Sequence, residues 1–63
     1  MPIVNIDIAS KLSKEQKSAL VKGVTASIIE VTKSPDHSVT IIINEVERDN
    51  IAKGGVLFSD RTL

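Results

Sequence analysis

Hydrophobic residues alternate along the start of the chain, over residues 2–8. A period of two is typical of a β-strand, because successive side chains point to opposite faces of a sheet. The side chains expected on one face are Pro2, Val4, Ile6 and Ile8. The opposite face would carry Ile3, Asn5 and Asp7, and therefore mixes apolar and polar side chains. We predict a first strand over residues 2–8 that begins directly behind Met1.

The pattern changes to a helical period after residue 12. Ser13 followed by Gln16 matches a capping box, in which two side chains satisfy backbone N–H groups at a helix start. Apolar residues then recur three and four positions apart, as on one helix face. They are Leu20, Val21, Val24, Ile28, Ile29 and Val31, and the residues expected on a solvated face are Lys14, Lys17, Lys22 and Glu30. Since Ser34-Pro35 ends the pattern, we predict a helix over about residues 13–33; close packing against a neighbouring backbone would explain Gly23 inside it.

The most apolar run of the chain is residues 39–46, which we predict to be the second strand. Val39, Ile41 and Ile43 would share one of its faces. A charged loop follows at residues 47–50, and Gly54-Gly55 then indicates a tight turn or a close approach of two backbones. Val56-Leu57-Phe58 is a candidate for a short third strand.

Strand, long helix and strand in this order predict a β-α-β unit of the α/β (α+β) class, with the two long strands parallel and adjacent. A single helix covers one face of a sheet, yet Ile3 and Ile42 place apolar side chains on the other face as well. A two-stranded sheet with apolar residues on both faces is not stable bare in water. We therefore predict a homo-oligomer, in which other copies cover the second face and the exposed sheet edges.

Length and composition narrow the function classes. The 63 residues suffice for one domain, residues 1–63. The chain has no cysteine and a single histidine, His37, which excludes disulfides and argues against a metal site; His37 is expected at the surface of a polar turn. A formal net charge of +0 and a single aromatic residue, Phe58, argue against a nucleic-acid partner. Without a signal segment or a membrane span, a cytoplasmic protein is expected.

Pro2 carries the candidate chemistry. If Met1 is removed, the Pro2 nitrogen becomes a secondary amine, which can act as a general base or as a nucleophile toward carbonyls. If Met1 stays, the same nitrogen is a tertiary amide with neither proton nor basicity. Desolvation beside the isoleucines of the strand, or nearby cations, would lower the pKa of the free amine toward neutrality. Small residues behind an initiator methionine, proline included, usually permit its removal, so we expect the cellular form to begin at Pro2.

Several short motifs occur together in one order and spacing: Pro2-Ile3-Val4-Asn5-Ile6, Ser13-Lys14-Glu15-Gln16-Lys17, Ser38-Val39, Glu45-Val46 and Gly54-Gly55. Together they resemble the small tautomerase family typified by 4-oxalocrotonate tautomerase, along essentially the whole chain. The resemblance implies the β-α-β tautomerase fold with a short C-terminal strand or hairpin, often assembled as a hexamer (a trimer of dimers). It further implies that Pro2 is the general base in enol–keto tautomerisation of 2-hydroxydienoate-type acids, with no cofactor, in aromatic hydrocarbon catabolism.

The chain departs from this family at the positions that bind substrate. Typical members have two arginines and a phenylalanine there, and this chain has Leu12, Thr40 and Ile51. An arginine fork binds a carboxylate bidentately, whereas threonine offers one hydroxyl and leucine offers nothing. Lys11 is the nearest replacement cation in sequence, so the resemblance leaves Lys11, Thr40 and Ile51 as candidate substrate contacts. Other cations that could act from a neighbouring subunit are Arg48, Lys53 and Arg61.

Three functions are consistent with these residues. The favoured one is a Pro2-dependent tautomerase for a small organic acid of the 2-hydroxydienoate or enolpyruvate type. A catalytically silent assembly subunit of the same fold is the alternative, and the missing arginines favour it. A dehalogenase or hydratase-like relative is less favoured, because such members keep arginines for the substrate.

Overall fold

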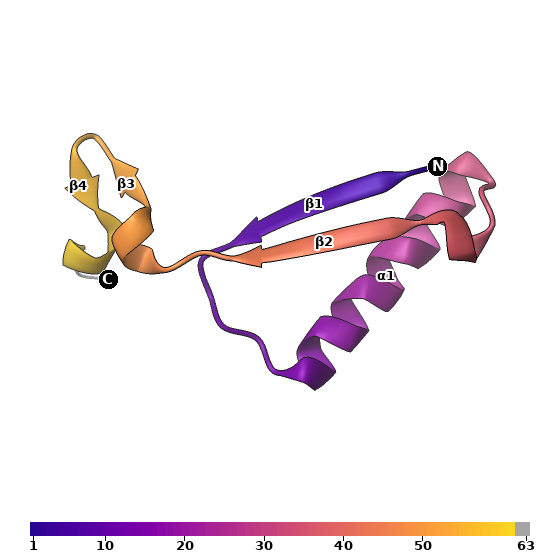
Figure 1. Ribbon diagram of the computed structural model, residues 1–63, viewed down its shortest axis with the longest axis horizontal. Helices are drawn as coiled ribbons and strands as arrows, with labels where there is room; N and C mark the ends of the chain where they lie inside the picture. Colours follow the sequence, from indigo (N-terminus) through magenta and orange to yellow (C-terminus); the bar gives the residue numbers. More distant parts are fainter. Residues whose placement is uncertain (62–63) are drawn as a thin grey trace.

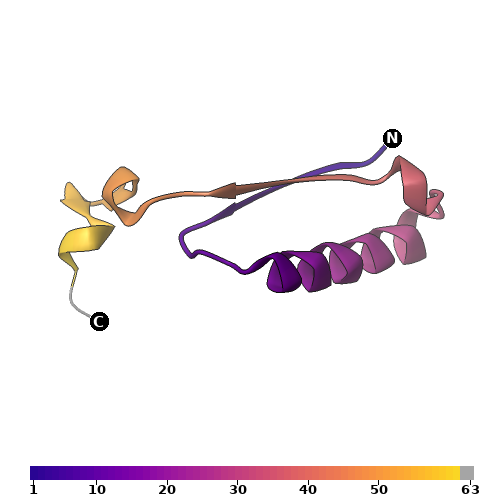
Figure 2. The same ribbon diagram turned by 60° about the horizontal axis from the view of Figure 1, so that its bottom comes forward.

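The structure is a computed structural model that describes residues 1–61. Strand β1 (Ile3–Ile8) leads through a loop to helix α1 (Lys14–Thr32), and strand β2 (Thr40–Glu45) follows. β1 and β2 pair in parallel, and α1 lies along one face of this sheet, as Figures 1 and 2 show. The predicted β-α-β unit with a parallel strand pair is therefore confirmed.

Local sequence signals determine both ends of α1. The Ser13 side chain accepts a hydrogen bond from the Gln16 N–H (3.1 Å), and the Gln16 side chain accepts one from the Ser13 N–H (2.8 Å). This is the predicted capping box. At the other end Lys33 adopts the left-handed conformation (φ 60°) and donates its N–H to the Ile29 carbonyl (2.9 Å). No helix within residues 1–61 combines the length and the hydrophobicity that a membrane crossing requires.

The two faces of the sheet differ in their exposure. The side chains of β1 and β2 on the α1 side are half-buried: Val4, Ile6, Ile8, Ile41 and Ile43. On the opposite face, Ile3 is 57% exposed to solvent and Ile42 is 45% exposed. The alternation predicted from the sequence is thus correct, and the second face of the sheet has no layer over it within the protomer.

Two helix positions differ from the prediction. Val31 was expected in the apolar stripe but is 81% exposed. The physical reason is length, because a 19-residue helix spans about 28 Å and a six-residue strand about 20 Å, so the last turn of α1 extends past the sheet. Lys17 was expected on the solvated face but is half-buried, and its ammonium meets the Glu45 carboxylate at 2.8 Å. Lys17 stands three and four residues before Leu20 and Val21, and therefore shares their face.

The C-terminal segment forms a small hairpin of β3 (Ala52–Lys53) and β4 (Val56–Leu57). Gly54 and Gly55 connect the strands with φ of 61° and 81°, which glycine adopts without strain. The predicted third strand is confirmed for its first two residues, whereas Phe58 begins a short 3-10 helix. Figure 1 shows that the hairpin projects beyond the sheet, at the end opposite Met1.

The protomer is too extended to bury a core by itself. Within residues 1–61 no side chain is fully buried. The accessible surface is 4,907 Å², compared with about 4,000 Å² for a monomeric protein of 6.8 kDa. The radius of gyration is 15.0 Å, compared with about 11 Å for a compact domain of this length. Apolar surface on the sheet and the hairpin is therefore left open by the isolated protomer.

Gly23 lies inside α1, at a position where a substitution can show whether another chain packs against this helix. A Cβ added at Gly23 would meet nothing within 4 Å, so the close packing expected from the sequence is not found within the described protomer.

Glycine in an exposed helix interior costs about 1 kcal/mol relative to alanine. We expect Gly23→Ala to raise the thermal midpoint by roughly 4–8 °C in calorimetry, and the exposed Ser18→Ala substitution on the same helix to raise it less. A lower midpoint and a smaller particle in light scattering would instead show that a neighbouring chain packs against Gly23.

Candidate active site

Pro2 lies immediately before β1, at the end of the sheet where both strands begin. Its carbonyl accepts a hydrogen bond from the Thr40 N–H (3.0 Å), which ties the start of β1 to the start of β2. Pro2 is half-exposed, and Figures 1 and 2 show the N-terminus at the same end of the sheet as the C-terminal end of α1. With Met1 in place the Pro2 nitrogen is a tertiary amide, and it becomes a basic amine when the bond to Met1 is cut.

Thr40 is the one candidate substrate contact that the described protomer places beside Pro2. It is the first residue of β2 and pairs with Ile3 of β1. Paired residues of parallel strands share a face, so the exposed Thr40 side chain lies on the face of the sheet that α1 leaves open. Pro2 and Thr40 are therefore neighbours through their backbones, and Thr40 contributes a hydroxyl at this end of the sheet.

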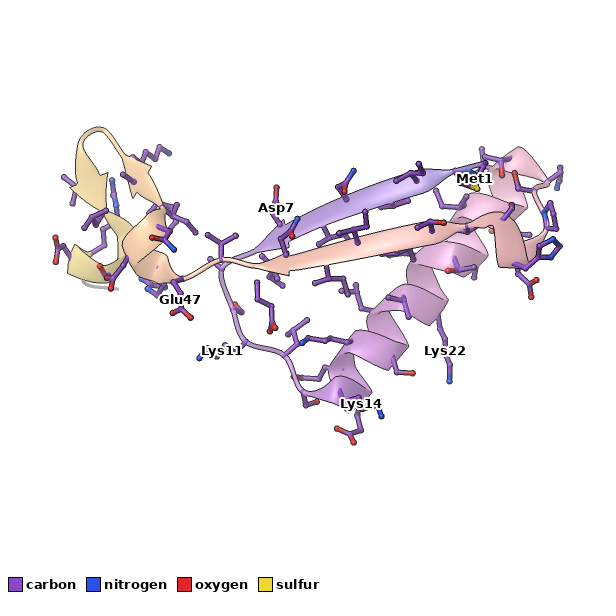
Figure 3. The ribbon with its side chains drawn as sticks, in the orientation of Figure 1. Met1, Asp7, Lys11, Lys14, Lys22 and Glu47 are labelled. Carbon is purple, nitrogen blue, oxygen red and sulfur yellow. The ribbon has the colours of Figure 1, made fainter. Side chains whose placement is uncertain are left out.

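Lys11 and Ile51 lie at the opposite end of the sheet, one strand length from Pro2. β1 alone has six residues, which corresponds to about 20 Å. The Lys11 ammonium is 3.8 Å from the Glu47 carboxylate, and the two side chains keep 84% and 67% of their exposure (Figure 3). Ile51 is half-buried at the base of the hairpin, where its carbonyl accepts a hydrogen bond from the Phe58 N–H (2.8 Å). One protomer therefore divides the predicted site between its two ends.

Arg48 and Arg61 hold the hairpin together. The Arg48 guanidinium donates a hydrogen bond to the Phe58 carbonyl (3.0 Å), and the Arg61 guanidinium donates one to the Lys53 carbonyl (2.8 Å). Arg61 also stands over the Phe58 ring, 5.6 Å from its centre. The sequence suggests both arginines as replacement cations for substrate binding, but in this protomer their guanidinium groups bind carbonyls of the C-terminal segment.

Glu45 is a functional candidate that the sequence analysis missed. Its carboxylate accepts hydrogen bonds from the Leu12 N–H and from the Lys17 ammonium, both at 2.8 Å. These donors lower the pKa of Glu45 below the usual glutamate range, with the Lys17 bond as the largest cause and the Leu12 bond as the next. Glu45 is 33 residues from Leu12, so only the strand register, which pairs Glu45 with Ile8, reveals the contact.

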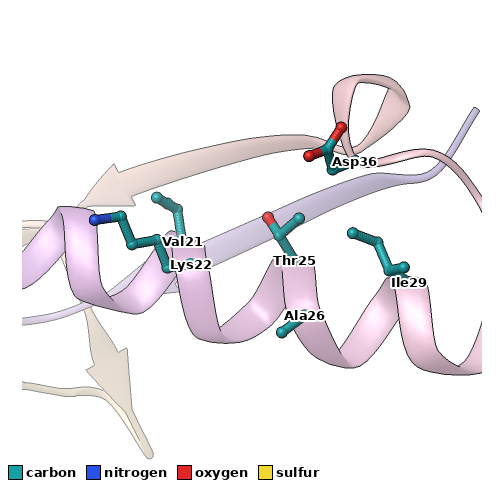
Figure 4. A pocket seen from close by; sticks show the side chains of 6 residues that line it. All are labelled: Val21, Lys22, Thr25, Ala26, Ile29 and Asp36. Carbon is teal, nitrogen blue, oxygen red and sulfur yellow. The ribbon is translucent and has the colours of Figure 1, made fainter.

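Other polar groups and hollows do not join this site. His37 is exposed and 3.9 Å from the Asp36 carboxylate, at the surface as expected. An open groove of ≈ 300 Å³ runs along α1 (Figure 4), and Pro2 is not among the residues that line it. The lining residues are Val21, Lys22, Thr25, Ala26, Ile29 and Asp36. Within residues 1–61, no three His, Asp or Glu side chains come together in a way that could hold a metal ion.

Comparisons with known proteins identify the family. The family model described as "Tautomerase enzyme" matches residues 2–61, and its match begins at Pro2. A probable tautomerase of Lactiplantibacillus plantarum is 40% identical over 60 residues, which cover 95% of this chain and 94% of that protein.

Solved structures extend the same result. YwhB, a homologue of 4-oxalocrotonate tautomerase, superposes with a TM-score of 0.89 at 30% identity and covers 97% of this chain and 100% of its own. A heterohexameric 4-oxalocrotonate tautomerase from Chloroflexus aurantiacus superposes with a TM-score of 0.84 at 27% identity, over 95% of this chain and 97% of that one. Because sequence and fold agree from Pro2 to the hairpin, the chain belongs to the tautomerase family and is an isomerase of the tautomerase type.

Proposed function

We propose that Pro2, freed by removal of Met1, is the general base of an enol–keto tautomerase that acts on a small 2-hydroxydienoate or enolpyruvate-type acid. The observation that carries the proposal is the position of Pro2: it is half-exposed at the end of the sheet where both strands begin, and the family match begins there. As part of this proposal, the reaction belongs to aromatic hydrocarbon catabolism, which the resemblance implies, and the enzyme is cytoplasmic, which the absence of cysteine suits.

The reaction needs only proton transfer. The lone pair of the Pro2 amine takes the proton of the enol hydroxyl while the carbonyl double bond forms and the electrons of the alkene move along the carbon chain. The protonated amine then returns a proton to carbon, so atoms and electrons balance within the substrate. The amine must be neutral before this step, and a nearby cation lowers its pKa in the required direction.

Lys11 is the cation that we propose for the substrate carboxylate. Arg48 and Arg61 are engaged in the hairpin, whereas the described partner of Lys11 is an exposed carboxylate at 3.8 Å. An exposed ion pair of this length contributes little to stability, so a substrate carboxylate can compete for the ammonium. In the same proposal the Thr40 hydroxyl offers a hydrogen bond to the substrate, and Ile51 supplies an apolar wall.

A complete site then requires more than one copy of the chain. Lys11 and Ile51 are separated from Pro2 of the same protomer by about 20 Å, the length of β1. We propose a homo-oligomer, with a hexamer built as a trimer of dimers favoured, in which one copy presents Pro2 and a neighbour presents Lys11. The uncovered sheet face and the open hairpin supply the apolar surface for such an assembly.

A catalytically silent assembly subunit is the second candidate. The observation that favours it is the absence of arginine at Leu12 and Thr40, which removes the bidentate carboxylate contacts of typical members. The Chloroflexus aurantiacus neighbour is a heterohexamer, and so contains more than one kind of chain. In such an assembly this chain would contribute surface and not chemistry. A dehalogenase or hydratase-like activity ranks below both, for the same lack of arginines.

The first test concerns the Pro2 amine. We expect Met1-free protein, verified by intact mass, to convert phenylenolpyruvate or 2-hydroxymuconate, and Pro2→Ala to lose about 10²- to 10⁴-fold in kcat/KM, because it removes the general base. The matched control inserts one alanine between Met1 and Pro2, so that the ring remains and its nitrogen becomes an amide. The control should be as inactive as Pro2→Ala. Equal near-background rates for all three proteins would favour the silent subunit.

The second test concerns Thr40, the uncharged residue whose backbone is hydrogen-bonded to Pro2. We expect Thr40→Arg to raise kcat/KM for the dicarboxylate 2-hydroxymuconate by about 10- to 100-fold, because a charged hydrogen bond is worth roughly 1.5–3 kcal/mol. The change for the monocarboxylate phenylenolpyruvate should be smaller. Thr40→Lys is the matched control, since it adds the charge without the planar fork and should gain less. Equal gains on both substrates would contradict a role of position 40 in binding a second carboxylate.

A further inference from the structure

The loop between β1 and α1 is held by one side chain that the proposed chemistry does not use. For residues 9–12, the hydrogen bond that the structure records is the one from the Leu12 N–H to the Glu45 Oε2 atom, at 2.8 Å. The other carboxylate oxygen, Oε1, accepts from the Lys17 ammonium at the same distance. Glu45 therefore joins the loop, α1 and the end of β2 at a single point.

The geometry also specifies which peptide is held. The Leu12 N–H belongs to the rigid peptide unit that joins Lys11 to Leu12. When Glu45 accepts this N–H, it orients the plane from which the Lys11 side chain departs. The first residue of α1 follows two residues later, where the Ser13 capping box begins the helix. Lys11 thus lies between a capped helix start and a strand end that Glu45 connects.

The two ion pairs at this end of the sheet differ in strength. Lys17 and Glu45 are 2.8 Å apart and keep 38% and 31% of their side-chain exposure, whereas Lys11 and Glu47 are 3.8 Å apart and keep 84% and 67%. A short, partly shielded, charge-assisted bond holds geometry better than a long exposed pair. The backbone of the loop is therefore fixed at Leu12, while the Lys11 ammonium remains available.

We propose that Glu45 is a positioning residue that holds the Lys11–Leu12 peptide so that the Lys11 ammonium meets the carboxylate of the substrate. This inference rests on the proposed function, in which Lys11 binds the substrate anion at the Pro2 of a neighbouring copy. Glu45 itself touches no substrate. Its effect is on substrate binding, because it orders the cation before the substrate arrives.

Steady-state kinetics on the Met1-free protein tests the effect on substrate binding. We expect Glu45→Ala to raise KM for phenylenolpyruvate by about tenfold and to change kcat by less than about threefold, because binding is weakened and the base is untouched. Glu45→Gln keeps an oxygen acceptor for the Leu12 N–H and should raise KM by only about two- to threefold. Lys17→Met keeps the acceptor for the Leu12 N–H but removes the ammonium that helps to hold Glu45, so it should raise KM by less than Glu45→Ala does. Loss of kcat with unchanged KM in Glu45→Ala would overturn the proposal.

An NMR titration of the unmodified chain tests the contact itself, with Glu45→Gln as the control. The charged groups that face Glu45 are Lys17 from α1 and Lys11 from the loop. The pKa of Glu45 is lowered, so the bond to the charged carboxylate persists below the usual glutamate range and is lost as the pH falls through the lowered pKa. We expect the Leu12 amide proton to move upfield over that interval, and to show no such titration in Glu45→Gln.

The outcomes separate this inference from the proposed function. If Pro2→Ala keeps full activity, the proposed function fails, whatever the Leu12 amide does. If Pro2→Ala is inactive but Glu45→Ala keeps its KM, or if the Leu12 amide does not titrate, the positioning role of Glu45 fails and the tautomerase proposal stands. Circular dichroism and light scattering on each variant show whether a change in KM comes from a lost fold or a lost assembly.

Discussion

A sheet has two faces, and the protomer has one long helix to cover them. This constraint governs most of what the structure shows. α1 half-buries the side chains of one face, while Ile3 and Ile42 stay about half-exposed on the other. Hydrophobic burial is the dominant favourable term in folding. Since none of the described residues has a fully buried side chain, the protomer gains only part of the stabilisation that its apolar side chains could provide. The remaining part is available to association with other chains.

The same constraint explains why the candidate site is divided. Parallel strands joined by a helix place every strand start at one end of the sheet and every strand end at the other. Pro2 directly precedes β1 and Thr40 begins β2, whereas Lys11 follows the end of β1 and Ile51 lies beyond β2, at the base of the hairpin. No rearrangement within one protomer removes a separation set by the length of β1. One protomer alone therefore does not bring the Pro2 base and the Lys11 cation together.

The sequence predicted what depends on near neighbours and missed what depends on register. The Ser13–Gln16 capping box and the Gly54-Gly55 turn involve residues up to three positions apart, and both were predicted. The bonds from Leu12 and Lys17 to Glu45 join residues 33 and 28 positions apart, and no local pattern encodes such a pairing. Lys17 was misassigned for a different reason: its spacing to Leu20 and Val21 is local, but a lysine is expected in solvent unless a partner is known. The hydrogen bonds of Arg48 and Arg61 likewise depend on the folded C-terminal segment, which brings the carbonyls of Phe58 and Lys53 to their guanidinium groups.

Proline is well suited to the start of β1 in either chemical state of its nitrogen. While Met1 is attached, Pro2 has no N–H to donate, so at the start of the strand it leaves no ladder hydrogen bond unmade. Pro2 is anchored instead through its carbonyl, which accepts the Thr40 N–H at 3.0 Å. That bond does not involve the nitrogen, and it is the same for an amide and for a free amine. Removal of Met1 can therefore change the chemistry of the nitrogen without releasing the residue from the sheet, so the proposed base would be held in place by the fold before it becomes basic.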